Sequence, residues 1–438
     1  MNTTKVLTGL ILICLMIFGG FSLLLSDEDT DKLEYDNAVA LANDYVKREL
    51  YQLAIVEYEK AVAILDSEEL RGNILDAYEK RYEEAPEILD AYIDAAKAAI
   101  SKYPQTADYY VILAKNQERN GDLQAAYKTI DRAKRSGISS DQMEEIYTRI
   151  AYLYDIKWYT HEDYHSCVAG FYPVKEDGKW GYLSEEGDHK SGFDYVFASQ
   201  VGEEGIRILC ADKNVLEDEK KMIRGRLSFV PSAAGIYSEG LVAIQKGKEY
   251  GYYDSLGDYK FGSYFRASNF SNGKAAVSVK EGEWFFIDAS GKRISDNTYQ
   301  EIRLNLDGSY HKGGVMLAKS GGKYRLYNQQ EEQIGNFECD DVDVLTEDGI
   351  VAFQNNGKWG FVDTAGNILV EAKFDRAKSF SNGLAAVCQD EKWGFSDKTG
   401  KVVIDYQFFD ADYFNSKRNC LVKTTAKDWQ MLSLLVKF

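Results

Sequence analysis

The sequence predicts an α + β multidomain chain, with α-helical hairpins first and an all-β array of about eight short repeats after them. Regularly spaced alanines with helical periodicity fill residues 33–156. From residue 167 to residue 438, a glycine followed ten residues later by an aromatic residue recurs at intervals near 35. The chain also contains 36 Gly, 31 Tyr and only 4 Pro, a composition that suits many short strands joined by tight turns.

The N-terminal segment contains an uncharged run at residues 6–25. A helix of about 20 apolar residues is long enough to cross a bilayer. The run ends in acidic residues without a small-residue cleavage site, which favours an anchor over a cleaved signal peptide. Lys5 precedes the run, so positive charge favours a cytoplasmic N-terminus. We therefore expect a cytoplasmic segment at 1–5, a transmembrane anchor at 6–25, an acidic linker at 26–32, and a single-pass cell-membrane protein whose bulk is extracytoplasmic.

Residues 33–156 are expected to form helical hairpins. The clearest unit lies between residues 107 and 137, an earlier unit lies at 35–65, and a degenerate one lies between them. Small side chains at fixed intervals allow two antiparallel helices to approach closely, and larger ones fill the space around them. The expected packing residues are Leu41, Ala42, Ala54, Leu113, Ala114, Gly121, Ala126 and Ala133. Their spacing resembles tetratricopeptide repeats, and a closing helix is expected from Asp141, its candidate N-cap, to Ile156.

The β repeats of residues 167–438 are defined by glycines and by the aromatic residues that follow them. Each unit consists of a short apolar strand, a tight turn, a second strand that begins Lys-Trp-Gly, and an Asp-x-x-Gly turn. Gly360, inside a strand, predicts that a bulky group from the neighbouring unit packs against bare backbone. The repeat-defining residues are Gly170, Trp180, Gly181, Gly240, Tyr250, Gly251, Gly273, Trp284, Gly314, Tyr324, Gly349, Trp359, Gly360, Gly383, Trp393, Gly394 and Trp429.

These units resemble the WG-repeat family of bacterial proteins, whose tandem copies contain the phrase Gly-Lys-Trp-Gly followed by an aromatic residue. The copies around Trp180, Trp359 and Trp393 are close to that phrase, whereas those near residues 215, 284 and 324 depart from it. The resemblance implies an all-β repeat array without shared catalytic residues. Stacked copies bury aromatic faces that one copy cannot bury alone. A period of 35 is short for a four-stranded propeller blade, so we expect an open array, with a β-propeller as the alternative.

One motif suggests chemistry. The segment "HEDYH" satisfies H-E-x-x-H, in which His161 and His165 would bind zinc and Glu162 would act as general base. The motif requires a buried apolar helix, but Asp163 lies inside it and a strand is expected nearby. We therefore interpret residues 157–166 as a polar junction, and we expect no catalytic residues, no metal and no cofactor. The cysteines are scattered and form no C-x-x-C pair.

The formal net charge of −18 argues against nucleic acid as a partner. The leading hypothesis is a membrane-anchored, extracytoplasmic binding scaffold of the cell envelope, not an enzyme, that engages a protein or peptide through its repeat surfaces. One alternative is binding of carbohydrate or cell-wall glycan by exposed aromatic faces. The other is a zinc metallopeptidase that uses His161, Glu162 and His165.

Overall fold

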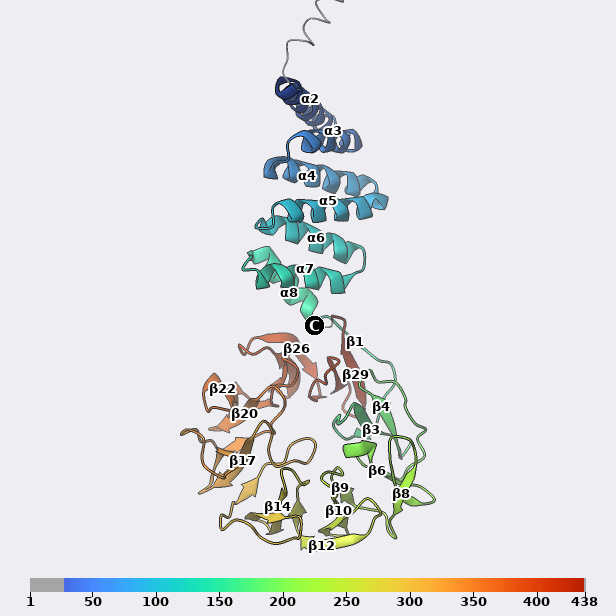
Figure 1. Cartoon of the computed structure of the whole chain (residues 1–438), viewed down its shortest axis with the longest axis vertical. Coiled ribbons are helices and arrows are strands. Elements are labelled where there is room, and N and C mark those ends of the chain that lie inside the picture. Colours follow the sequence, from blue (N-terminus) through green and yellow to red (C-terminus); the bar gives the residue numbers. More distant parts are fainter. Residues whose placement is uncertain (1–26, 437–438) are drawn as a thin grey trace, which may run out of the picture. The chain divides into compact units, whose positions relative to one another are not determined.

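The computed structural model describes residues 27–436, which divide into two compact units between Ala151 and Tyr152 (Figure 1). The first unit is helical, and it begins earlier than expected. Residues 27–32, expected to be an acidic linker, are the first turns of helix α2. The helices are α2 (Asp27–Lys47), α3 (Tyr51–Ile64), α4 (Glu68–Glu84), the 3-10 turn η1 (Pro86–Ile88), α5 (Leu89–Lys102), α6 (Ala107–Arg119), α7 (Leu123–Arg135) and α8 (Asp141–Ala151).

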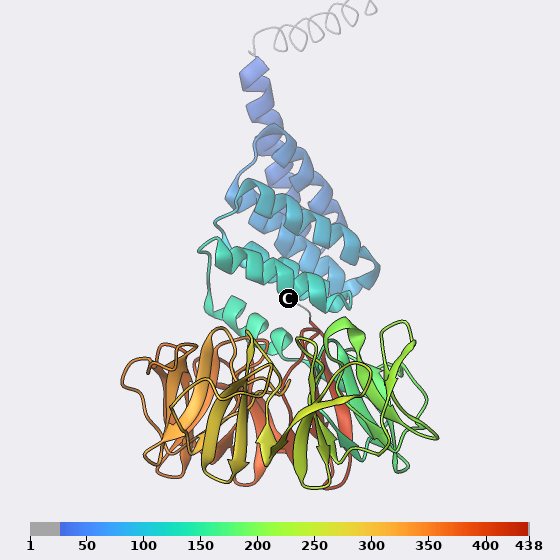
Figure 2. The same cartoon turned by 60° about the horizontal axis from the view of Figure 1, so that its bottom comes forward.

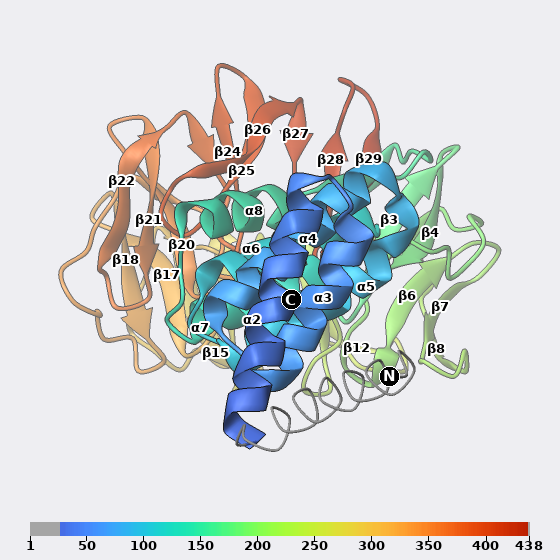
Figure 3. The same ribbon diagram turned by 90° about the horizontal axis from the view of Figure 1, so that it is seen from above.

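Antiparallel hairpins build the helical unit, with α2 against α3, α4 against α5, and α6 against α7 (Figure 3). Side-chain caps mark several helix starts: the Ser67 hydroxyl accepts from the Leu70 N–H at 3.2 Å, and the Asp122 carboxylate accepts from the Ala125 N–H at 2.8 Å. Ser140, instead of Asp141, caps α8, because the Ser140 hydroxyl accepts a hydrogen bond from the Met143 N–H. The closing helix also stops at Ala151, earlier than expected.

Most of the expected packing residues of the helical unit lie in its core. Leu41 is the exception, because its side chain is 41% exposed while Ala38 and Ala42 form the buried stripe of α2. Gly121 has φ of +76° in the turn between α6 and α7, a backbone conformation that glycine adopts at little cost. The expected packing residues that are buried are Ala42, Ala54, Leu113, Ala114, Ala126 and Ala133.

Within residues 27–436, no helix combines the length and the apolar character needed to cross a membrane. This finding contradicts the expected location of the chain as a single-pass protein of the cell membrane. The run at 6–25, from which that location was inferred, and the segment 1–5 lie outside the described residues.

The second unit consists of eight small antiparallel sheets, which we call blades 1 to 8. In most blades a two-residue strand comes first, followed by longer strands. Blade 1 contains β2 (Asp163–Tyr164), β3 (Phe171–Glu176) and β4 (Lys179–Ser184); blade 2 contains β5 (Phe197–Ala198), β6 (Arg207–Cys210), β7 (Asn214–Glu217) and β8 (Ile223–Arg226), with the 3-10 turn η2 (Glu203–Gly205); blade 3 contains β9 (Ala233–Ala234), β10 (Val242–Lys246), β11 (Glu249–Tyr253) and β12 (Tyr259–Tyr264); blade 4 contains β13 (Arg266–Ala267), β14 (Lys274–Lys280) and β15 (Glu283–Asp288).

The remaining blades repeat this order. The last one differs, because it takes a strand from the start of the unit. Blade 5 contains β16 (Glu301–Ile302), β17 (Val315–Ser320) and β18 (Lys323–Asn328); blade 6 contains β19 (Asp341–Val342), β20 (Ile350–Asn355), β21 (Lys358–Asp363) and β22 (Ile368–Phe374); blade 7 contains β23 (Arg376–Ala377), β24 (Ala385–Gln389), β25 (Lys392–Ser396) and β26 (Val402–Phe408); blade 8 contains β27 (Asp410–Ala411), β28 (Asn419–Lys423), β29 (Trp429–Leu434) and β1 (Tyr154–Ile156).

The blades close into a ring, which corresponds to the propeller alternative instead of the preferred open array (Figures 1 and 2). Strand β1 pairs antiparallel with β29, so the first and last segments of the unit share blade 8. His161 and Trp429 continue the seam by exchanging two backbone hydrogen bonds of 2.8 Å. The period of about 35 suffices for a blade because the innermost strand of each blade has only two residues. Residues 157–166, expected to be a junction, therefore belong to the ring.

The glycine that follows the key aromatic residue has a role different from the one expected. A Cβ at Gly360 would lie 2.4 Å from the Val370 carbonyl oxygen, and one at Gly394 would lie 2.4 Å from that of Ile404. Both contacts come from the outer strand of the same blade, where the strand pairing shifts register. The glycine thus makes room for the blade's own bulged backbone, not for an aromatic residue of the neighbouring unit.

The most deeply buried rings lie two residues after the key aromatic position. Phe361 and Phe395 are fully buried, and each meets a ring from a connector edge-on, with centroids 4.6 and 4.9 Å apart. Tyr252 and Phe286 make the same contact in blades 3 and 4, both at 4.9 Å. Edge-to-face pairs contribute about 0.5–1.5 kcal/mol beyond area burial, so these rings form the repeated core of the ring of blades.

Candidate functional site

The helical unit contains a groove of about 270 Å³ between α4 and α6. Residues 112, 115, 116 and 119 follow helical spacing, so α6 presents them on one face. The groove is lined by Asp76, Glu79, Tyr92, Ile112, Lys115, Asn116 and Arg119.

An ion pair fixes one wall of this groove. Both terminal nitrogens of Arg119 bind the Glu79 carboxylate at 2.6 Å, and Arg119 Nη1 also donates to Asn116 Oδ1 at 2.9 Å. The hydrogen bond from Arg119 is the main reason why the pKa of Glu79 is lowered. A bidentate pair of this kind holds its planar groups in a defined orientation, so Asn116 is held in place through its oxygen.

Asn116 is the unusual member of the groove. Its side chain is 1% exposed and interacts with the Tyr92 hydroxyl, but its Nδ2 makes no hydrogen bond of standard geometry within residues 27–436. Leaving a buried donor unpaired costs about 1–3 kcal/mol. An incoming acceptor, such as a peptide carbonyl, would recover that cost.

Two further charges line the groove. Lys115 and Asp76 form no ion pair within residues 27–436, and burial raises the pKa of Asp76. The groove therefore offers donors and an acceptor side by side, as an extended peptide backbone requires. The sequence analysis did not single out Asn116; the available signal was a polar residue on the otherwise apolar inner face of α6.

At the centre of the ring, one position recurs just after the innermost strand of each blade. The N–H of this residue donates to a carbonyl of the next strand in every blade. In blades 5 to 8 the residue at this position is charged, and the sign alternates from blade to blade. Two of these residues form ion pairs with the next blade: Arg303 binds Asp341 at 2.7 Å, and Lys378 lies 3.5 Å from Asp412. Burial raises the pKa of Asp412 despite Lys378. The eight residues are His165, Ser199, Gly235, Ser268, Arg303, Asp343, Lys378 and Asp412.

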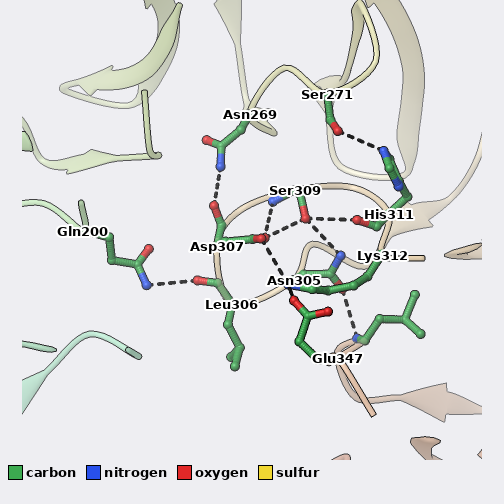
Figure 4. Close-up of polar contacts among 11 residues, drawn as sticks. Gln200, Asn269, Ser271, Asn305, Leu306, Asp307, Ser309, His311, Lys312 and Glu347 are labelled. Atoms are coloured by element: carbon green, nitrogen blue, oxygen red, sulfur yellow. Dashed lines mark hydrogen bonds and ion pairs between the residues drawn. The ribbon is translucent and has the colours of Figure 1, made fainter. Parts of the chain in front are cut away.

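A long connector in blade 5 lies among polar side chains of other blades, as Figure 4 shows. This loop, residues 305–312, accepts hydrogen bonds from Gln200 of blade 2 at 3.0 Å and from Asn269 of blade 4. It also accepts from the Leu345 N–H of blade 6 at 3.0 Å, and its Lys312 binds Glu347 at 2.9 Å. The extra residues in this repeat thus connect blades that are far apart in sequence.

A cavity of about 370 Å³ lies beside loop 305–312. Most of its polar lining is already used within the ring. Asn415, for example, donates to the Glu185 carbonyl and accepts from the backbone of Lys417 and Asn419. Ser381 and Thr346 donate to backbone carbonyls. The polar groups of this cavity therefore serve mainly to join blades.

The "HEDYH" segment is not helical, so the geometry required by the zinc alternative is missing. It forms the innermost strand of blade 1, where Glu162 accepts from the Gly178 N–H at 3.2 Å. Asp340 and Asp375 cap the equivalent turns of blades 6 and 7. His165 stacks on Trp180, with ring centroids 4.7 Å apart. No group of three or more His, Cys, Asp or Glu side chains within residues 27–436 is arranged to hold a metal ion.

The repeat-defining residues occupy equivalent places around the ring. The leading glycines Gly170, Gly240, Gly273, Gly314, Gly349 and Gly383 all have positive φ. The key rings lie at the start of the third strand: Trp284, Tyr324, Trp393 and Trp429 are buried, and Trp180, Tyr250 and Trp359 are half-buried. Gly181 and Gly251 contact rings of their own blades, Phe193 and Tyr259. These key rings are therefore buried or half-buried, and none of them is fully exposed.

Comparison with known proteins identifies part of the ring. The family of WG containing repeats matches residues 324–359, 359–393 and 393–423. No curated protein sequence matches the chain. Among solved structures, BamB from Moraxella catarrhalis is 10% identical, with a TM-score of 0.45, covering 64% of this chain and 100% of its own.

Two solved structures resemble the helical unit. The TPR2B domain of yeast Sti1, in a complex with pHsp70, is 18% identical with a TM-score of 0.22, covering 26% of this chain and 94% of its own. The TPR domain of Sgt2 from Aspergillus fumigatus is 20% identical with a TM-score of 0.22, covering 26% of this chain and 76% of its own. Residues 324–423 are therefore WG containing repeats, and the chain joins them to an N-terminal region that has seven helices within residues 27–151.

Proposed function

We propose that this protein is a non-catalytic binding scaffold whose helical unit holds an extended peptide segment of a protein partner in the groove between α4 and α6. The observation that supports this most directly is Asn116, a buried side chain at the groove whose Nδ2 makes no hydrogen bond of standard geometry, although it interacts with the Tyr92 hydroxyl. Repeat architectures act through extended surfaces instead of bond-making groups.

The groove favours a peptide over other ligands for a geometric reason. An extended backbone presents alternating carbonyl and N–H groups, and Asn116 Nδ2 and the Asp76 carboxylate provide a donor and an acceptor for them. Ile112 supplies an apolar surface for one side chain. Affinity would come from hydrogen bonds, and selectivity from the charges of Lys115 and Asp76.

A peptide-display selection against the full chain tests this proposal. Enriched peptides are measured by calorimetry against wild type and against Asn116→Asp, which keeps the oxygen that accepts from Arg119 but removes the Nδ2 donor. We expect the variant to lose about 5- to 150-fold in affinity, equivalent to 1–3 kcal/mol. Asn120→Asp is the matched control, because Asn120 is exposed at the C-terminal end of α6, outside the lining of the groove.

Thermal unfolding of both variants checks that the helical unit stays folded. Failure to enrich any peptide would contradict the proposal, as would equal binding to wild type and Asn116→Asp. The glycan alternative is not proposed for the row of key rings as a whole, because those rings are buried or half-buried.

A further inference from the structure

A groove of about 610 Å³ lies between the outer strands of blades 2 and 3. Strand β8 and the residues after it form one side, and strands β11 and β12 form the other (Figure 1). The Phe229, Tyr250, Tyr253 and Tyr259 rings line it, together with three glycines. Tyr253 is buried among the apolar residues that join blades 2 and 3, and Phe229 packs against them, whereas Tyr259 is exposed.

Tyr259 is held in place with one ring face available. The other face packs on the bare backbone of Gly251, where a Cβ would lie 2.9 Å from Tyr259 Cε2. The hydroxyl donates to the Gly262 carbonyl at 2.9 Å, and the Tyr253 ring meets it edge-on at 5.6 Å. Even so, the residue is 56% exposed. A ring fixed in this way loses little conformational freedom when a ligand stacks on it.

The fold itself does not require an aromatic residue at this position. The strand register makes Ile368 of blade 6 and Val402 of blade 7 equivalent to Tyr259. In those blades, the glycine equivalent to Gly251 contacts outer-strand backbone instead of a ring. Blade 3 therefore has an exposed ring where blades 6 and 7 have an aliphatic side chain.

The rim of the groove carries charges of both signs. Arg226 and Lys246 line it and form no ion pair within residues 27–436, although the chain as a whole is strongly acidic. The Lys246 ammonium lies 5.0 Å from the centroid of the Phe229 ring. Glu249 accepts from the Ser263 hydroxyl at 2.7 Å and, with Asp258, supplies acceptors.

We infer that this groove binds an acidic oligosaccharide, with one sugar ring stacked on Tyr259 and a carboxylate of the ligand facing Arg226 and Lys246. The apolar face of a sugar ring matches an exposed tyrosine face, and its hydroxyls match the carboxylates and hydroxyls at the rim. The two unpaired cations favour an anionic sugar over a neutral one. The net charge of −18 disfavours a nucleic-acid strand, which would also stack on rings.

A glycan array that contains matched acidic and neutral oligosaccharides, probed with the full chain, tests this inference. The best acidic glycan and its neutral counterpart are then measured by calorimetry. We expect Tyr259→Ala to lower affinity for the acidic glycan about tenfold or more, and Tyr259→Phe to retain most of it. Double replacement of Arg226 and Lys246 by alanine should reduce binding of the acidic glycan and leave the neutral one unchanged.

Ile368→Ala is the matched control, because it truncates an exposed side chain at the equivalent position of blade 6. Asn116→Asp, in the other unit, should leave glycan binding unchanged, so the two proposed sites are tested separately. Retention of no glycan would overturn the inference, as would binding that is insensitive to Tyr259→Ala. Equal affinity for the acidic glycan and its neutral counterpart would overturn the assignment of an acidic ligand.

Discussion

Acidification should weaken the seam that closes the ring of blades, because a buried histidine lies there. The His161 side chain is fully buried, and its Nδ1 lies 2.8 Å from Glu176 Oε1. His189 approaches the same oxygen at 3.6 Å, and Tyr159 contacts both imidazoles, with centroids 5.5 and 5.7 Å apart. Burial first, and the charge of His189 second, lower the pKa of His161 from 6.5 to about 4.

The sign of the effect follows from this lowered pKa. The unfolded chain takes up a proton at His161 near pH 6.5, whereas the folded chain resists it until about pH 4. The contribution of neutral His161 to the free energy of unfolding is therefore fully present above pH 6.5, and it is lost as the pH falls from 6.5 to 4. The complete loss corresponds to about 3 kcal/mol, at 1.36 kcal/mol per pKa unit, and the loss between pH 7 and pH 5 is about 2 kcal/mol.

Glu176 acts in the opposite direction. Burial raises the pKa of its carboxyl, so protonation of Glu176 relieves a cost as the pH falls and offsets part of the loss at His161. Glu176→Gln removes this offset, because an amide does not titrate. We therefore expect a steeper loss of stability with falling pH in Glu176→Gln than in wild type.

Hydrogen exchange of the His161 and Trp429 amides measures opening of the seam directly, since each donates to the other's carbonyl at 2.8 Å. Between pH 7 and pH 5, the opening constant of wild type should rise by up to about 20-fold after correction for intrinsic exchange rates. His161→Gln should remove this pH dependence. Equal pH dependence in wild type and His161→Gln would refute the reasoning.

Two predictions concern the repeated core of the blades, and urea unfolding followed by tryptophan fluorescence measures both. Gly360→Ala should destabilise the ring by about 1–3 kcal/mol, because the new Cβ would lie 2.4 Å from the Val370 carbonyl oxygen of its own blade; unchanged stability would contradict the assigned role of this glycine. Phe395→Ala, at a fully buried ring, should cost about 3–5 kcal/mol, whereas Phe409→Ala, at a ring that is 46% exposed, should change stability much less. Similar losses in the two phenylalanine variants would be inconsistent with the described core.

Several features of the ring were accessible from sequence because they depend on residues close together in the chain. The leading glycines, such as Gly383 with φ of +87°, mark turns that need a left-handed backbone. The Asp-x-x-Gly turns were accessible for the same reason: Asp363 accepts from the N–H groups of Ala365 and Asn367. Turn chemistry of this kind is local, so the strand order can be predicted from one copy, and the period follows from the spacing between copies.

The candidate sites were less accessible. Asn116 matters because Glu79 on another helix fixes Arg119 and leaves the amide nitrogen of Asn116 without a hydrogen bond of standard geometry. Tyr259 matters because strand register places its ring on Gly251. Neither contact follows from spacing along one element. The "HEDYH" segment was misleading because its pattern is local. Two histidines four residues apart face the same way only on a helix, and this segment is extended.

The sequence by itself determined the two structural classes, the period of the repeats and the turns that separate their strands, since each rests on interactions within about 35 residues. Tertiary structure alone decided that the blades close. An open array and a ring share one local repeat, and they differ only in whether β1 meets β29. That pairing joins segments separated by nearly the whole second unit, and it depends on the angle between successive blades, which is set by packing and not by any single copy.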